Sequence, residues 1–302
     1  MKKAIRFSII VCLFSWAMAA IAHWGFGMGA DTPAGLMVFS TAYMFFPLAT
    51  ALVLQKIDKE KFNHTGLVNF KFSGAWLVAW LLPVVMVFVC ILVNGLMPGV
   101  ELKYNVEQLI NIGQIPEDQQ ELVREQMMKF PAWLMAVITV FSGLIAGASV
   151  NAFCAFGEEY GWRNYLVNAL REKKFWSAAL FIGFVWGIWH LPLILMGHNY
   201  PNEPYWGVLL MVVFCVLAGV LELYFVLKTK SMIVAAVMHG TINAVAGMTI
   251  YFTLGGNEFV NGMTGLSGFI VLALAIVCCW VYDRFIAKER IFAQTLETSL
   301  ER

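Results

Sequence analysis

Long apolar runs dominate this sequence and constrain its fold more than any other feature. A helix needs about 20 apolar residues to cross the hydrocarbon core of a bilayer, and about eight stretches reach or approach that length. They cover residues 5–25, 35–54, 74–96, 132–156, 176–196, 206–227, 232–254 and 265–285. Only 13% of the residues are charged, against about a quarter in a soluble domain. We therefore predict an all-α, polytopic membrane helix bundle with about eight transmembrane helices, forming one integral membrane domain over residues 1–302.

Lysine and arginine are distributed unevenly between the segments that join these runs. Segments on the cytoplasmic side of a membrane protein carry the excess of both residues. If the N-terminus lies inside, all but three of the 20 lysines and arginines fall on the cytoplasmic side. The three exceptions are Lys103, Arg124 and Lys129. We therefore predict cytoplasmic N- and C-termini, cytoplasmic segments at 55–73 and 157–175, and an outer segment at 98–131.

Two segments carry further predictions. Residues 116–129 have a helix-forming composition with a polar face, which indicates a solvated helix in the outer segment. The first run has an alternative interpretation, because Lys2 and Lys3, a short apolar stretch and small residues ending at Ala22 resemble a bacterial signal peptide. Cleavage there would leave the remaining topology unchanged. Because the N-terminus resembles those of bacterial proteins, we predict a location in the bacterial inner (cytoplasmic) membrane.

The remaining composition excludes other classes of protein. The net charge is +1, and no basic stripe with interleaved aromatic residues is present, so we predict no nucleic-acid partner. The cysteines form no C-x-x-C pair, and all lie inside apolar runs, where they are predicted to be small buried hydrophobic residues. They are Cys12, Cys90, Cys154, Cys215, Cys278 and Cys279.

Charged groups at the end of the fourth run are candidates for function, because ionisable side chains are costly inside a membrane. Glu159 and Arg163 are four residues apart, so they share a helix face and can form an ion pair. Glu158 is turned about 100° away from Glu159 and has no such partner in its own helix. The alternative is a helix end that enters water, where charges are ordinary.

Two histidines and a glutamate lie inside later runs. His190 lies past the midpoint of the fifth run, so either that run begins later or the site reaches the middle of the bilayer. His239 and Asn243 are one helical turn apart and should face the interior of the bundle. The structural alternatives are a buried core histidine and polar contacts between helices. Glu222 is expected to snorkel or to pair with Lys228 or Lys230, with a structural or substrate-facing role.

Together these groups form a set suited to acid–base or metal chemistry in a site that excludes water. No G-x-S-x-G motif accompanies them, no H-E-x-x-H motif is present, and no cysteine lies in these stretches. Hydrolysis by an activated water molecule is the chemistry that this set favours.

The same residues resemble the motifs of the CAAX-protease and bacteriocin-processing (Abi) family of intramembrane proteases, which includes the type II CAAX prenyl endopeptidases. Two glutamates and an arginine stand as Glu158-Glu159-x-x-x-Arg163, and a histidine and an asparagine as His239-x-x-x-Asn243. The family also has a phenylalanine four residues before a histidine. In this chain a tryptophan stands at that position, as Trp186-x-x-x-His190. This replacement concerns packing more than chemistry. The resemblance covers about residues 132–251.

The resemblance implies a role for each motif residue. Glu158 would activate water with His190, while His239 and Asn243 would stabilise the oxyanion. Glu159 and Arg163 would support the site. Members of the family are described both as metalloproteases and as metal-free, glutamate-driven enzymes. A zinc ion, if present, would be held by Glu158, His190 and His239. We favour the metal-free form, because an asparagine such as Asn243 is a poor zinc ligand but a good oxyanion donor.

The predicted function is thus an intramembrane endopeptidase that cuts a peptide or lipidated peptide near the cytoplasmic face, among membrane lipids. The alternative is a non-catalytic membrane immunity or scaffold protein of the same fold. A transporter that uses the buried groups as a proton relay would favour inverted halves with matching broken helices, and the sequence has no such halves. Convergence of Glu158, His190, His239 and Asn243 would favour the enzyme.

Overall fold

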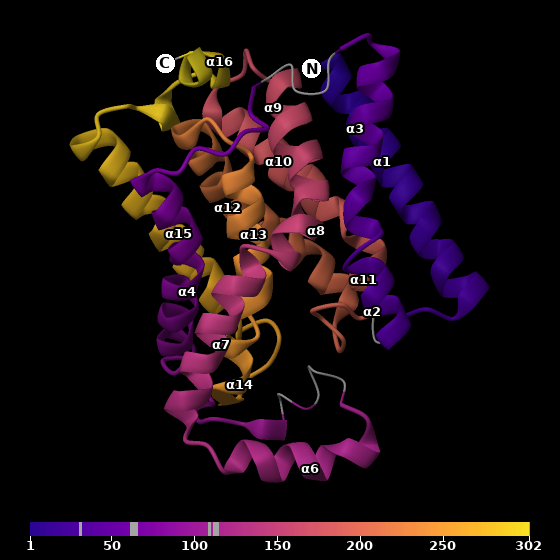
Figure 1. Ribbon diagram of the computed structural model, residues 1–302, viewed down its shortest axis with the longest axis vertical. Helices are drawn as coiled ribbons and strands as arrows, with labels where there is room; N and C mark the ends of the chain where they lie inside the picture. The colour runs from indigo at the N-terminus through magenta and orange to yellow at the C-terminus, as the bar shows by residue number, and fades with distance from the viewer. Residues whose placement is uncertain (30–31, 61–65, 108–109, 111–114, 302) are drawn as a thin grey trace.

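A computed structural model describes residues 1–29, 32–60, 66–107, 110 and 115–301. The predicted helical membrane bundle is confirmed, since six helical spans are long and apolar enough to cross a bilayer. These spans are Lys2–Gly25, Pro33–Ile57, Gly74–Asn94, Pro204–Thr229, Ile233–Tyr251 and Leu266–Ile286. Figure 1 shows them as a bundle in which both termini lie at the same end.

Several of these spans consist of more than one helical element. The first and second spans contain α1 (Lys2–Ala20), η1 (Ile21–Gly25), α2 (Pro33–Phe39), η2 (Tyr43–Phe45) and α3 (Phe46–Ile57). The later spans contain α4 (Gly74–Asn94), α12 (Pro204–Thr229), α13 (Ile233–Val245), α14 (Met248–Tyr251), α15 (Leu266–Val281) and η4 (Tyr282–Ile286). Serine caps the start of α4, where the Ser73 side chain accepts a hydrogen bond from the Trp76 main-chain N–H.

Two of the predicted runs are not continuous helices. Residues 132–156 divide into α7 (Ala132–Gly147) and α8 (Val150–Glu159), with Ser149 outside the helical conformation at φ −124° and ψ −96°. Residues 176–196 divide into α10 (Phe175–Trp189), which has only 15 residues, and α11 (Leu191–Leu195). Proline has no N–H, and its ring clashes with the carbonyl four residues earlier, so Pro192 prevents α10 from continuing as one helix. The count of about eight spans stays a prediction.

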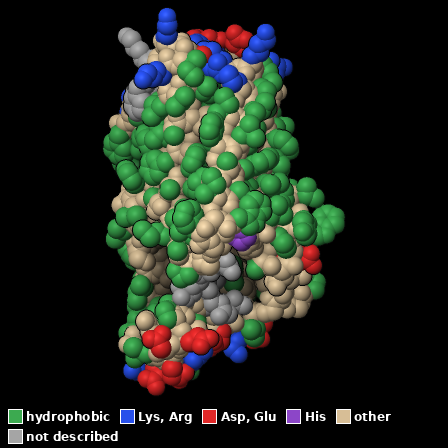
Figure 2. Space-filling view, turned by 90° about the vertical axis from the view of Figure 1, so that its right-hand side faces the viewer, with side chains coloured by type: hydrophobic (Ala, Val, Ile, Leu, Met, Phe, Trp, Pro, Cys, Tyr) green, Lys and Arg blue, Asp and Glu red, His purple; other side chains and the backbone are tan. Residues whose placement is uncertain are grey.

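The segment expected outside the membrane lies at the end of the bundle opposite the termini (Figure 1). The predicted helix there is confirmed as α6 (Glu117–Met128), which has no buried residues and is bent by 109° from α7. Beside it, β1 (Val100–Leu102) pairs antiparallel with β2 (Thr253–Gly255), so that Val100 lies opposite Gly255. In Figure 2, apolar side chains cover the middle of the visible face, and charged side chains gather at its two ends.

Glycines allow two pairs of helices to approach each other closely around the centre of the bundle. A Cβ atom at Gly183 of α10 would lie 2.5 Å from the Cα of Val216 on α12. A Cβ atom at Gly240 of α13 would lie 2.5 Å from the carbonyl oxygen of Gly147 and 2.6 Å from the main-chain nitrogen of Ala152. Because real Cβ atoms do not come so close, both helix pairs depend on the missing side chain.

The C-terminal segment covers the end of the bundle that carries the termini (Figure 1). It contains η5 (Ile291–Ala293) and α16 (Leu296–Glu301). The ring of Phe292 stacks on Tyr224 of α12 with centroids 4.9 Å apart, and Thr295 forms an antiparallel bridge with Lys174 before α10. This segment therefore fixes the ends of α10 and α12 relative to each other.

Candidate active site

The paired glutamates lie where α8 ends inside the protein. The chain continues from Glu159 into the π-helical segment η3 (Tyr160–Tyr165) and the short helix α9 (Leu166–Ala169). π-Helical turns are rare and frequently occur at functional sites. Glu158 is 2% exposed and Glu159 has no exposed surface. The alternative interpretation, in which this helix end enters water, is therefore wrong.

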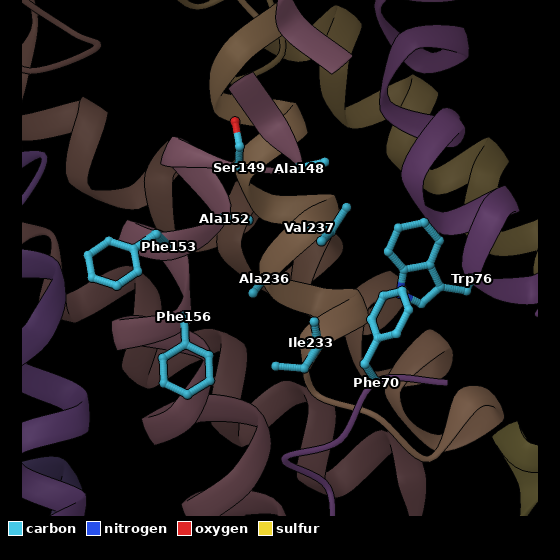
Figure 3. Close-up of a pocket in the computed structure, with 10 residues that line it drawn as sticks. All are labelled: Phe70, Trp76, Ala148, Ser149, Ala152, Phe153, Phe156, Ile233, Ala236 and Val237. Atoms are coloured by element: carbon cyan, nitrogen blue, oxygen red, sulfur yellow. The ribbon is translucent and has the colours of Figure 1, made fainter. Parts of the chain in front are cut away.

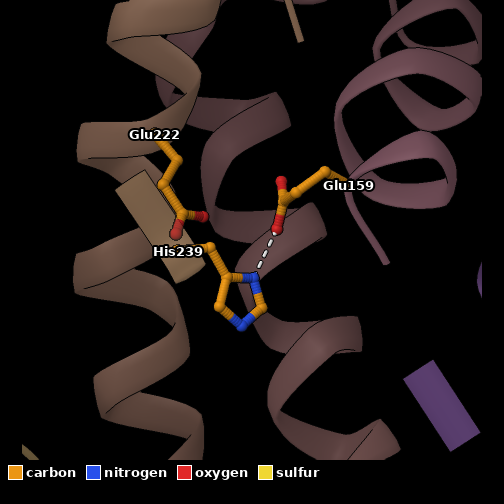
Figure 4. Close-up of side chains that lie close together, drawn as sticks. All are labelled: Glu159, Glu222 and His239. Carbon is orange, nitrogen blue, oxygen red and sulfur yellow. Dashed lines mark hydrogen bonds and ion pairs between the residues drawn. The ribbon is translucent and has the colours of Figure 1, made fainter. Parts of the chain in front are cut away.

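Glu159 connects the motif Glu158-Glu159-x-x-x-Arg163 with the motif His239-x-x-x-Asn243. The predicted pairing with Arg163 is confirmed, since Nε of Arg163 lies 3.2 Å from Oε2 of Glu159 and both side chains are fully buried. Oε1 of Glu159 lies 2.9 Å from Nδ1 of His239 on α13 (Figure 4). A carboxylate bound to one ring nitrogen of a histidine fixes the orientation of the ring. Glu159 therefore directs Nε2 of His239 away from itself.

Glu222 on α12 is the second carboxylate of this cluster. Its side chain is fully buried and forms an ion pair with Nη2 of Arg163. The expected pairing with Lys228 or Lys230 is wrong, because Lys228 binds Glu289 at 2.7 Å and Lys230 donates to a main-chain carbonyl oxygen. A buried carboxylate needs a close cation, and the tertiary fold supplies Arg163 for this purpose.

Glu158 has a different environment, formed by indole groups. Its Oε2 accepts hydrogen bonds from Nε1 of Trp186, at 2.7 Å, and from Nε1 of Trp162, at 3.3 Å. The Trp186 ring also lies 4.7 Å below the guanidinium of Arg163, and its centroid is 5.3 Å from that of His239. Sequence reasoning missed the two indole donors, although Trp162 stands four residues after Glu158.

His190 follows the last residue of α10, so it lies at the end of a short helix rather than within a long one. Its Nδ1 lies 2.9 Å from the main-chain oxygen of Trp186, which leaves Nε2 as the ring nitrogen for chemistry. The ring centroids of His190 and Trp186 are 5.9 Å apart. The Sγ atom of Cys215 on α12 lies 3.8 Å from Nδ1.

Asn243 differs from the expectation that it faces the bundle interior. His239 is only 6% exposed, as expected, but the Asn243 side chain is exposed. The neighbouring helix α7 packs closely against Thr241 of α13. Two residues further along a helix, a side chain points to nearly the opposite face. α7 therefore leaves Asn243 uncovered.

The three-ligand zinc site that the sequence offered as an alternative stays a prediction. Among the described residues, the metal-type side chains whose ligand atoms lie within 4.8 Å of one another are Glu159, Glu222 and His239 (Figure 4). The trio of Glu158, His190 and His239 forms no such group. Arg163 already pairs with both carboxylates of the observed group.

An apolar pocket of about 500 Å³ lies beside the site, between α8, α13 and the start of α4 (Figure 3). None of the predicted site residues lines it. Its wall contains Phe70, Trp76, Ala148, Ser149, Ala152, Phe153, Phe156, Ile233, Ala236 and Val237. The pocket therefore lies on outward faces of the two helices that carry Glu158 and His239.

A helical membrane protein with a buried cluster of carboxylates and imidazoles is thus the class that fold and site define. Residues 129–245 match the family described as type II CAAX prenyl endopeptidase Rce1-like. CAAX prenyl protease 2 of Methanococcus maripaludis is 32% identical over 92 residues, which are 28% of this chain and 34% of that protein. The resemblance to the CAAX-protease and bacteriocin-processing family is confirmed, and the matched stretch contains every predicted site residue.

Proposed function

We propose that this protein is an intramembrane endopeptidase, in which Glu158 and His190 activate the water that hydrolyses a peptide bond near the cytoplasmic face. The supporting observation is that three motif residues lie around one residue, Trp186. Glu158 accepts its indole N–H at 2.7 Å, Nδ1 of His190 binds its main-chain oxygen at 2.9 Å, and the ring of His239 lies 5.3 Å away. The match to an endopeptidase family over the same stretch supports the same reaction class.

The proposed reaction is a base-assisted attack of water on the peptide carbonyl. Glu158 takes a proton from the water, whose oxygen attacks the carbonyl carbon while Nε2 of His190 holds it in place. The resulting oxyanion receives hydrogen bonds from His239 and Asn243, which stabilise the developing charge. The C–N bond then breaks as Glu158 returns the proton to the leaving amine.

Glu159 and Arg163 support this reaction by orienting His239. Nδ1 of His239 donates to Glu159, so donation from Nε2 to the oxyanion requires the protonated ring. Nearby Glu222 and Glu159 provide the negative charge that accompanies such an imidazolium. Arg163 fixes both carboxylates in place.

The proposed mechanism needs no metal ion, because water activation falls to Glu158 and charge stabilisation to the two donors. Purified protein in detergent should therefore cleave members of a peptide library, with and without a lipid group, and chelation should leave the rate nearly intact. The Glu158→Gln variant, purified in parallel, is the control for contaminating proteases. Complete loss on chelation with recovery on adding zinc would contradict the metal-free form. Absence of cleavage of every peptide would favour an immunity or scaffold protein instead.

We further propose that the site faces the cytoplasm of a bacterial inner membrane. The positions of the lysines and arginines support this orientation. A cysteine placed at Asp118 should react with an impermeant reagent added from outside, and one placed at Lys59 should react only after the membrane is opened. The reverse pattern would overturn the orientation while leaving the reaction untouched.

A further inference from the structure

Trp186 is the side chain that connects the separate parts of the site. It stands on α10, is 3% exposed, and touches residues from three other segments. Its N–H binds Glu158, its ring face lies below Arg163, and its ring is tilted against that of His239. The family motif predicts only an aromatic residue at this position. A phenylalanine would provide the ring contacts but no N–H donor.

The indole hydrogen bond matters because, among the residues that the structure describes, no cation forms an ion pair with Glu158. A buried carboxylate must be hydrogen-bonded or paired, since loss of water around it is costly. Both donors of Glu158, Trp186 and Trp162, bind the same oxygen, Oε2. Hydrogen bonds to ionised acceptors are shorter and stronger than neutral ones, and the Trp186 bond, at 2.7 Å, is the shorter of the two. Oε1 is therefore the oxygen left for a water molecule.

We infer that Trp186 is a positioning residue that holds Oε2 of Glu158 through its indole N–H and so directs Oε1 to the attacking water. This inference rests on the proposed function of Glu158 as the base. It assigns to Trp186 a role in the chemical step, in addition to packing. The role differs from that of Glu159, which orients His239 on the other side of the site.

The first test compares two variants that each lose one indole N–H. Trp186→Phe removes the donor to Glu158, whereas Trp80→Phe removes a donor to the main-chain oxygen of Leu144, away from the site. We expect kcat of Trp186→Phe to fall about tenfold, the lower range for loss of a hydrogen bond to a charged group. KM should stay within about twofold of wild type, because ground-state binding is unchanged. Trp80→Phe should change neither constant.

The second test needs no catalytic activity. A double-mutant cycle combines Trp186→Phe with Glu158→Leu, which has no acceptor, and measures Tm in detergent. The double variant should lose less Tm than the sum of the single losses, by about 2–4 °C. The same cycle with Trp80→Phe should be additive. This readout holds even if the wild-type protein cleaves no peptide, so failure of the proposed function and failure of this inference are distinguishable.

Two results would overturn the inference. One is an equal loss of kcat in Trp186→Phe and Trp80→Phe, which would show a packing effect only. The other is an additive cycle between positions 186 and 158. If Trp186→Phe does not accumulate, Trp162→Phe replaces it, because Trp162 donates to the same oxygen at 3.3 Å. That variant should show a smaller change in the same direction, and no change in kcat or in the cycle would equally overturn the inference.

Discussion

Arg163 and Arg124 each bind two glutamates, but the surroundings of the two arginines are opposite. Arg163 lies inside the bundle between Glu159 and Glu222, and none of the three side chains has exposed surface. Around them the chain buries aromatic and aliphatic residues. A cluster of this kind must keep its charges matched, because water cannot replace a lost partner.

Arg124 forms the corresponding cluster beside α6, at the end of the bundle opposite the termini. Its side chain is 31% exposed, and its partners Glu107 and Glu121 are 56% and 76% exposed. The hydrogen bonds are short, 2.6 Å to Glu107 and 2.8 Å to Glu121. The bond from Arg124 lowers the pKa of Glu107 below its ordinary value. Water and salt nonetheless screen this cluster.

Geometry alone does not set how much an ion pair contributes to stability. The contact between Arg163 and Glu159, at 3.2 Å, is longer than those of Arg124, yet its loss should cost far more. Burial determines the difference, because desolvated charges have no alternative partner. Within the buried region Glu158 is a further case, since its carboxylate accepts two indole N–H groups and pairs with no cation in the described part of the chain. Four substitutions separate these cases.

The largest effect is expected for Arg163→Ala. It leaves two buried carboxylates without their cation, and breaking one buried pair costs about 3–5 kcal/mol. We expect the yield of folded protein to fall sharply and Tm to drop by about 10 °C or more, measured by thermal unfolding in detergent. A Tm close to wild type would show that water or protons already compensate Glu159 and Glu222, and the contrast with Arg124 would disappear.

Glu158→Gln should affect activity rather than stability. The amide keeps the size of the side chain and an oxygen that accepts the two indole N–H groups, but it removes the proposed base. We expect kcat/KM to fall at least about a hundredfold, the usual scale for acid–base catalysis, while Tm stays near wild type. Peptide cleavage and thermal unfolding measure the two quantities. An active Glu158→Gln beside a stable, inactive Glu159→Gln would exchange the roles of the two glutamates.

Glu159→Gln should lower both quantities moderately. Arg163 keeps a partner in this variant, because Glu222 also pairs with it. The main loss is the carboxylate that orients His239. We expect about a tenfold loss of kcat/KM, the lower end of the effect of removing a partner of a histidine's second ring nitrogen. Tm should drop by several degrees. Wild-type activity here would show that His239 needs no orientation by Glu159.

The smallest effect is expected for Arg124→Ala, the control for Arg163→Ala. Exposed ion pairs contribute little, so Tm should change by at most about 2 °C and cleavage should be unchanged. The small stabilisation is present above the ordinary pKa of a glutamate and is lost as the pH falls through the lowered pKa of Glu107. A Tm drop as large as that of Arg163→Ala would refute the role given to burial.

The helical membrane class and part of the site could be predicted because they depend on local features. Apolar runs of sufficient length identify the spans, and the spacing of Glu159 and Arg163 places them on one helix face. The helix ends inside two runs were harder to predict. Pro192 indicates one of these helix ends. The break at Ser149 is accompanied only by a run of small residues that begins at Gly147, and such residues also occur within continuous membrane helices.

The remaining contacts depend on how distant segments pack. Arg163 and Glu222 are 59 residues apart, and no periodic pattern links them. The family motif predicts only a packing role for Trp186, because its usual phenylalanine has no hydrogen-bond donor. The exposure of Asn243 depends on which helices cover α13, which spacing alone does not determine.

Gly240 has a consequence for how mutations in this protein are interpreted. It directly follows His239, and its hydrogen atom is all that fits between α13 and the main chain around Gly147 and Ala152. In a saturation mutagenesis screen it should tolerate alanine as poorly as the neighbouring histidine tolerates any change. The two positions would look alike by loss of function, but only one carries a reactive group. Measuring the activity per folded molecule for each variant would separate them, because it should fall in a His239→Ala protein and stay near wild type in the Gly240→Ala protein that does fold.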